Sequence, residues 1–137
     1  MENSHEHSGR AGDGGRMRTA LVTGATGLLG GNLVRELDRR GWAIRALVRD
    51  AARARRLLSG VARLTPVVGD LERVDDWAAA LDGVDVVFHA AAYFRESYRG
   101  GSHWERLRTV NVDGTRALVA AAVARGAWTV PTAAAVR

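Results

Sequence analysis

The chain has 137 residues, of which 47% are hydrophobic and 26% charged, a balance that fits one globular domain and excludes a largely disordered chain. Its apolar runs fall short of the roughly 20 residues that a membrane-spanning helix needs, and without cysteine it has neither a disulfide framework nor a thiolate metal site. The net charge is +5, but all 20 basic residues are arginines scattered along the chain, which does not favour nucleic acid as a partner.

The first 17 residues are rich in glycine, serine, histidine and charge, and we expect a disordered tail there. His5 and His7 lie in this tail and are not expected to bind a metal, so no metal site is predicted. The segment also lacks the apolar middle of a secretory signal. A cytoplasmic location is therefore expected.

From Arg18 onward, stretches typical of strands alternate with stretches typical of helices. The expected strands cover 19–24, 43–48, 64–68 and 85–90, and the expected helices cover 28–40, 51–58, 73–81 and about 105–124. The first helix has an apolar stripe at helical spacing, made of Leu28, Leu29, Leu33, Val34 and Leu37. Pro66 places the third strand at a sheet edge, because proline cannot donate to a strand ladder. The alternation predicts an α/β fold with a doubly wound parallel sheet in the order 3-2-1-4 over residues 18–126.

Glycines recur every third residue where the first strand meets the first helix, in "LVTGATGLLGGNLV". Gly24, Gly27 and Gly30 permit a tight turn, a close approach of the backbone to a pyrophosphate, and close packing of helix on strand. The first N–H groups of the helix favour a phosphate there. The pattern therefore predicts a dinucleotide-binding loop.

The segment "TGATGLLG" resembles the cofactor motif of extended short-chain dehydrogenases/reductases, the family of NAD-dependent epimerases/dehydratases and dihydroflavonol reductase-like enzymes. Three more segments follow in that family's order: "VVGDL" (67–71), "FHAAA" (88–92) and "NVDGT" (111–115). The resemblance covers residues 18 to about 125 and implies only the N-terminal part of such an enzyme. It implies a Rossmann-type sheet that ends after strand four or five.

The resemblance also implies roles for individual residues. Asp70 would hydrogen-bond the adenine amino group, although it could instead only cap the next helix. Asn111 would support the family's proton relay, whereas His89 is expected to be structural rather than catalytic. The residues expected to contact the dinucleotide are Gly24, Thr26, Gly27, Leu28, Leu29, Gly30, Arg49, Asp70, Leu71, Ala90, Ala91 and Ala92.

The end of the second strand bears on the choice of cofactor. A dinucleotide without a 2′-phosphate usually meets an acidic residue there, but Val48 occupies the place and Arg49 follows. "IRALVRD" is similar to dihydroflavonol reductase-like members, in which this arginine faces the 2′-phosphate of NADP. Arg53 would add a second charge, whereas Asp50 stands one residue late for a ribose acceptor. NADP is therefore the expected cofactor, with NAD as the alternative.

The family's Tyr-x-x-x-Lys pair is absent, because these 137 residues contain no lysine. Tyr93 and Tyr98 lie in the loop after the fourth strand, where with Phe94 and Trp104 they would line a substrate side or pack on the sheet. Residues 127–137 are atypical and are interpreted as a frameshifted or truncated tail, with a fifth strand conceivable in "AWTV". We expect an NAD(P)-binding part of an oxidoreductase that is inactive alone; the alternative is a non-catalytic module that senses redox state or complements a partner chain.

Overall fold

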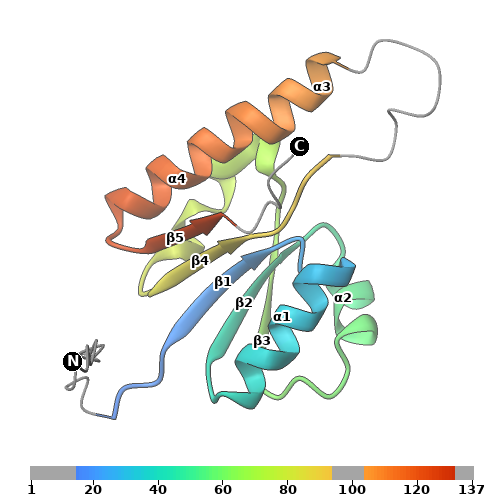
Figure 1. The fold of residues 1–137 in the computed structure, drawn as a ribbon, viewed down its shortest axis with the longest axis vertical. Helices are drawn as coiled ribbons and strands as arrows, with labels where there is room; N and C mark the ends of the chain where they lie inside the picture. The colour runs from blue at the N-terminus through green and yellow to red at the C-terminus, as the bar shows by residue number, and fades with distance from the viewer. Residues whose placement is uncertain (1–14, 94–103, 132–137) are drawn as a thin grey trace, which may run out of the picture.

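The computed structural model describes residues 15–93 and 104–131, with side chains up to residue 128. Five parallel strands form one sheet in the order β3-β2-β1-β4-β5 (Figure 1). The strands are β1 (Thr19–Thr23), β2 (Ala43–Val48), β3 (Leu64–Val68), β4 (Val86–His89) and β5 (Trp128–Pro131). This confirms the Rossmann-type fold and the order 3-2-1-4, with β3 and its Pro66 at an edge. The fifth strand lies in the segment interpreted as atypical.

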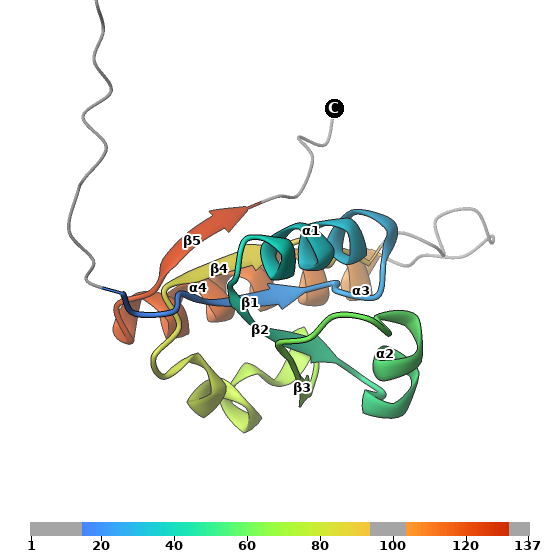
Figure 2. The ribbon, with the colours of Figure 1, turned by 90° about the horizontal axis from the view of Figure 1, so that it is seen from below.

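Helices cover both faces of the sheet, as a doubly wound fold requires (Figure 2). One face carries α1 (Leu28–Arg39) and α2 (Ala51–Leu57). The other carries the 3-10 segments η1 (Leu71–Asp76) and η2 (Ala78–Leu81) and one long helical run. That run consists of α3 (Trp104–Arg108), the π-helical segment η3 (Thr109–Asp113) and α4 (Gly114–Ala124).

Alternation along β1 divides the core into two layers. Leu21 faces the layer under α4, η1 and η2, whereas Ala20 and Val22 face the layer under α1 and α2. All three side chains are fully buried. A strand with apolar residues on both faces is typical of a parallel sheet covered on both sides, so the continuous apolar run in the sequence is explained.

The helix expected over 73–81 is wrong in type, since the chain forms two 3-10 segments there, and Arg73 has non-helical backbone angles. Trp77 gives a physical reason for this arrangement. Its indole Nε1 donates to Asp70 O at 2.7 Å, and its ring packs against Gly69, where a Cβ atom would overlap it. These contacts favour a tighter local path than an α-helix.

The apolar stripe of α1 begins later than expected. Val34 and Leu37 are buried, but Leu28 is 87% and Leu29 53% exposed. These two residues lie in the first turn, at the end of the helix nearest the β1–α1 loop, so the stripe that packs on the sheet starts at Leu33.

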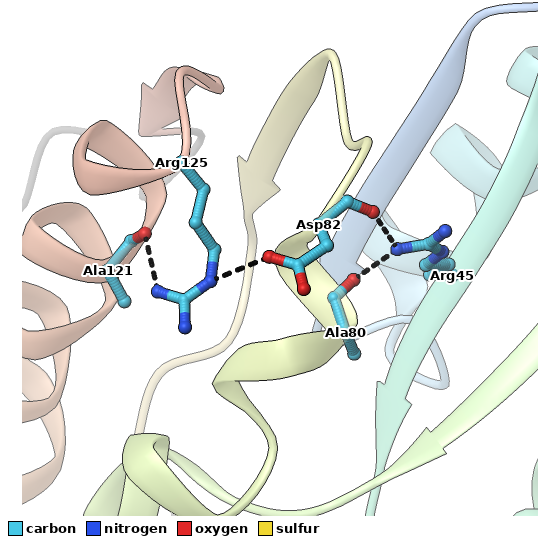
Figure 3. A network of polar contacts seen from close by, with 5 residues as sticks. All are labelled: Arg45, Ala80, Asp82, Ala121 and Arg125. Atoms are coloured by element: carbon cyan, nitrogen blue, oxygen red, sulfur yellow. Dashed lines mark hydrogen bonds and ion pairs between the residues drawn. The ribbon is translucent and has the colours of Figure 1, made fainter.

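A polar network joins the carboxyl end of α4 to the turn before β4 and to β2 (Figure 3). The Arg125 guanidinium donates to Asp82 Oδ1 at 3.0 Å and to Ala121 O at 3.3 Å. From β2, Arg45 donates to the carbonyl oxygens of Ala80 and Asp82, both at 2.6 Å. The two bonds from Arg45 satisfy carbonyl groups in the segment before β4.

Candidate functional site

The segments predicted to bind a dinucleotide all follow the carboxyl ends of strands. Gly24 follows β1, Arg49 follows β2, Asp70 lies two residues after β3, and Ala90 follows β4. Because the strands are parallel and in register, with Thr23 paired to both Leu47 and His89, these ends meet at one edge. Ligands of open α/β sheets bind outside this edge, where the strand order reverses.

The β1–α1 loop is shaped by contacts that leave no room for a side chain at Gly24 or Gly30. Gly24 has φ +66°, and a Cβ atom there would lie 2.7 Å from Ala91 N and 2.8 Å from Ala90 O. Gly27 N donates to Gly24 O at 3.0 Å and closes the turn. A Cβ atom on Gly30 would overlap the Gly24 carbonyl. The glycines thus bring the loop, the helix and the segment after β4 together.

The amino end of α1 suits an anion. Its N-cap is Gly27, with no side-chain hydrogen bond, and its first turn has no acidic residue. The first N–H groups of a helix lack partners within the helix and carry partial positive charge. Thr26, Leu28 and Leu29 are exposed around them. A pyrophosphate placed here would find donors and no opposing charge from the helix start.

The turn after β2 contains a free arginine and an engaged aspartate. Asp50 is the N-cap of α2, and its Oδ1 accepts from Arg53 N at 2.9 Å. This bond is the main cause of a lowered pKa of Asp50. The side chain of Arg49 is exposed and, within the described part of the chain, its guanidinium has no hydrogen bond or ion pair. Gly69 N donates to Val48 O at 3.0 Å, which ties this turn to the segment containing Asp70.

Asp70 caps η1, the simpler of the two expected roles. Its Oδ1 accepts from Glu72 N at 2.9 Å and from Arg73 N at 3.1 Å. The hydrogen bond to adenine stays a prediction. Leu71 is buried against Gly114, where a Cβ atom would lie 2.8 Å from Leu71 O. Gly114 in "NVDGT" thus allows α4 to pack closely on the segment after β3.

Asn111 lies in the π-helical segment and holds the chain after β4. Its Oδ1 accepts from Tyr93 N at 2.8 Å and its Nδ2 donates to Tyr93 O at 3.0 Å. This pair of bonds fixes the residue that follows Ala90, Ala91 and Ala92. The Arg106 guanidinium lies 5.1 Å from the centre of the Tyr93 ring. The proton-relay role of Asn111 stays a prediction; Phe94 and Tyr98 lie outside the described residues.

A buried polar chain runs from the end of β1 to α4. Ala91 N lies 3.1 Å from Thr23 Oγ1, which lies 2.7 Å from His89 Nδ1. His89 Nε2 lies 2.9 Å from Thr115 Oγ1, which donates to Asn111 O at 2.7 Å. Thr23 and Thr115 were not among the predicted site residues, although both stand in the quoted motifs. A polar residue inside an otherwise apolar buried strand was the available signal.

One negative finding applies to residues 15–93 and 104–131. No group of three or more metal-ligating side chains is present in them, and His5 and His7 lie outside them. A cavity of about 240 Å³ lies away from the glycine loop, between α1 and the segment after α2, lined by Arg35, Asp38, Arg39, Ser59, Gly60 and Val61. The cavity therefore lies apart from the loop predicted to bind a dinucleotide.

Known proteins resemble this chain over much of its length. Sterol demethylase protein B of Methylococcus capsulatus is 45% identical over 101 residues, covering 74% of this chain and 29% of that protein. The 3-beta-hydroxysteroid dehydrogenase of Mycolicibacterium neoaurum is 38% identical over 107 residues, covering 72% and 27%. The crystal structure of a short-chain dehydrogenase/reductase superfamily protein from Agrobacterium tumefaciens with bound NAD has a TM-score of 0.67 at 30% identity, covering 83% and 32%. The chain thus spans less than a third of each.

The sequence model of a family described as NAD(P)H-binding matches residues 24–130, from the first glycine of the loop into β5. The expected resemblance to short-chain dehydrogenases/reductases is confirmed by these relatives. In the described residues no helix is long and apolar enough to cross a membrane. Sequence, fold and loop geometry agree, and the chain belongs to the NAD(P)H-binding family, with relatives of the short-chain dehydrogenase/reductase type.

Proposed function

We propose that this chain is the dinucleotide-binding part of an epimerase/dehydratase or dihydroflavonol reductase-like oxidoreductase, with the cofactor's pyrophosphate over the amino end of α1. The observation that carries the proposal is the Gly24–Gly30 loop. Its shape excludes side chains at Gly24 and Gly30, and its helix start offers N–H groups with no acidic residue in the first turn. These are the features that a closely approaching phosphate requires.

The proposed cofactor is NADP, on the strength of the turn after β2. Arg49 is exposed and without a partner in the described residues, whereas the carboxylate of Asp50 is engaged as a helix cap. A planar guanidinium can bind a 2′-phosphate through two parallel hydrogen bonds. Arg53 lies four residues further along, in α2, and adds positive charge. An NAD-selective site would instead need a free carboxylate at this turn.

In the proposed enzyme, hydride passes between the nicotinamide and a carbinol or ketone carbon of the substrate. The proton shuttle for that step needs a tyrosine whose pKa is lowered by a nearby lysine. No lysine occurs in these 137 residues, so the pair has to come from outside them. We therefore propose that these residues bind the cofactor and do not turn over substrate by themselves.

Fluorescence titration of the purified chain with NADPH and NADH tests both parts of the proposal. We expect saturable binding of both, with NADPH preferred, and loss of that preference in Arg49→Ala. Arg116→Ala is the matched control, because it removes the same charge from an exposed position on α4. Absence of binding to a folded chain would refute the proposed function, whereas an unchanged preference in Arg49→Ala would refute only the NADP site.

A non-catalytic dinucleotide-binding module is the second candidate, and the absence of lysine is the observation that favours it. Such a module would bind the cofactor without turnover even when joined to a partner chain. Assembly with a partner that restores oxidation or reduction would instead favour the enzyme fragment. Retention of DNA that weakens steeply with salt would point to the third reading, a basic nucleic-acid binder.

A further inference from the structure

His89 joins three elements at the carboxyl edge through buried and partly buried hydrogen bonds. It ends β4 and is only 6% exposed. Its Nδ1 lies 2.7 Å from the hydroxyl of Thr23, the last residue of β1, and its Nε2 lies 2.9 Å from the hydroxyl of Thr115 in α4. Both ring nitrogens are thus engaged, on opposite sides of the ring.

The other hydrogen bonds of the two threonine hydroxyls determine which nitrogen of His89 carries the proton. Thr115 Oγ1 donates its one proton to Asn111 O, so it must accept from His89, which places a proton on Nε2. At the other side, Thr23 Oγ1 accepts from Ala91 N–H and donates its proton to Nδ1. The arrangement satisfies every member when the imidazole is neutral with its proton on Nε2. Burial also lowers the pKa of His89, which favours the neutral ring.

This series of hydrogen bonds lies directly behind the cradle, which is the β1–α1 loop together with residues 90–92, where the dinucleotide is proposed to bind. Thr23 precedes Gly24, and Ala91 N, which donates to Thr23, is the atom that a Cβ on Gly24 would approach to 2.7 Å. At the other end, the hydrogen-bond series reaches Asn111, whose side chain bonds the backbone of Tyr93. The same set of hydrogen bonds thus holds the β1–α1 loop close to the segment after β4 and holds α4 against both.

We propose that His89 is a positioning residue whose neutral, Nε2-protonated ring sets the nucleotide cradle against α4, so that protonation of the ring weakens dinucleotide binding. The inference rests on the proposed dinucleotide binding. An imidazolium presents a second N–H to Thr23 Oγ1, whose proton can then no longer go to Nδ1. Thr23 Oγ1 can accept from both Nδ1–H and Ala91 N–H, but its own proton then loses its buried acceptor, so the hydrogen bonds behind Gly24 have to rearrange.

Among residues 15–93 and 104–131, the elements around His89 contain few charged groups. Neither β1, β5 nor the rest of β4 contains a titratable side chain. In the helical run, Asp113 and Arg116 are exposed and lie 4.0 Å apart as an ion pair. Tyr93 is titratable, but its ring lies beneath Arg106. In the range between about pH 5 and pH 8, where histidine titrates, His89 is the buried group among these described side chains whose charge changes.

The tautomer is measurable without any nucleotide. Long-range ¹H–¹⁵N spectra of the full chain distinguish protonated from unprotonated ring nitrogens, and His89→Gln assigns the signal among the four histidines. We expect Nδ1 unprotonated and Nε2 protonated at neutral pH. A ring protonated on Nδ1 alone, or on both nitrogens at neutral pH, would overturn the proposal while leaving dinucleotide binding untouched.

The effect on binding is measured with NAD⁺, which lacks the 2′-phosphate that itself titrates near pH 6. In the wild-type chain we expect the dissociation constant to rise, by up to about tenfold for each pH unit below the pKa of His89. In His89→Gln the amide can still donate to Thr115 but does not titrate, so we expect a flat profile over the same range. An equal slope in both proteins would contradict the proposal.

Thr115 provides a matched pair that does not alter the histidine. Thr115→Val removes the hydroxyl and keeps the shape, and it should weaken NAD⁺ binding by about three- to tenfold. Thr115→Ser keeps the hydroxyl and should restore wild-type affinity. Equal affinity of Val and Ser variants would overturn the positioning role. Absence of NAD⁺ binding to the folded wild-type chain would refute the proposed function and its pH dependence together, whereas the tautomer is decided independently.

Discussion

The loop from β1 to α1 and the turn from β2 to α2 are neighbours at the same edge of the sheet, yet the first is held by backbone packing and the second by a side-chain cap. In the first, Gly24 and Gly30 exclude any Cβ atom. In the second, Asp50 caps the helix and Arg49 is exposed. The shape of the β1–α1 loop is thus built into the core, whereas the proposed choice between NADP and NAD rests on a surface residue that can change without affecting the fold.

Gly24→Ala should produce the largest effect, because it combines a left-handed backbone with an overlap on Ala90 and Ala91. We expect a loss of about 3 kcal/mol in unfolding free energy and no measurable NADPH binding. Gly41→Ala is the matched control: Gly41 has φ +80° but open space around it, so only the backbone strain of about 1 kcal/mol should remain. Urea unfolding compares the two, and equal losses would show that the close approach does not matter.

Gly114→Ala tests the packing of α4 on the segment after β3. A Cβ atom there would lie 2.8 Å from Leu71 O and 2.9 Å from Leu71 Cβ. Alanine favours a helix by about 1 kcal/mol over glycine, so the overlap has to outweigh that gain. We expect a net loss of about 1–2 kcal/mol in thermal unfolding. A stabilised variant would mean that the two segments separate without cost.

Arg49→Ala should leave the free energy of unfolding within about 0.5 kcal/mol of wild type, because the side chain is exposed and unpaired in the described residues. NADPH affinity should fall about tenfold and NADH affinity should not change. Parallel titrations with the two cofactors make the comparison. An equal loss for both would mean that Arg49 acts on the shared part of the dinucleotide.

Asp50→Ala should have the opposite pattern. Loss of the cap on α2 should cost about 1 kcal/mol of stability. The ratio of NADPH to NADH affinity should stay close to that of the wild type, because the carboxylate is engaged within the turn. A selective loss of NADH binding would instead identify Asp50 as the ribose acceptor.

The stability of the fold should also depend on pH through His89. The pKa of His89 in the folded chain is below the usual value of 6.5, because burial disfavours the charged ring. As the pH drops below 6.5, the unfolded chain binds the proton before the folded chain does. The free energy of unfolding should therefore fall as the pH drops from 6.5 through the folded-state pKa. Above 6.5 this contribution is complete. Thermal unfolding across this range should show a shallower slope in His89→Gln than in wild type.

The sequence indicated most of the fold because its strongest signals are local. Apolar runs, the spacing of Gly24, Gly27 and Gly30, and Pro66 at an edge are each visible within a few residues, and they predicted the strand order. The 3-10 form of η1 and η2 was not predictable in this way, since it depends on Trp77 packing on Gly69.

The site could also be predicted only where its features are local in sequence. The glycine loop was predictable because its backbone geometry requires glycine at fixed positions. The bonds from His89 to Thr23 and Thr115 join residues 66 and 26 positions apart, and they exist only once β1, β4 and α4 are packed together. Likewise, whether Asp70 caps a helix or binds adenine is not a property of its local sequence.

The central claim is that a dinucleotide binds across the β1–α1 loop, and a residue-resolved NMR titration of the full chain with NADPH tests it most directly. We predict saturable shifts of the amide signals of Gly24, Gly27, Gly30 and Ala91, which line the cradle, with small changes at Arg35 and Asp38 beside the separate cavity. A folded chain that shows no shifts, or shifts centred on Arg35 and Asp38, would contradict the account.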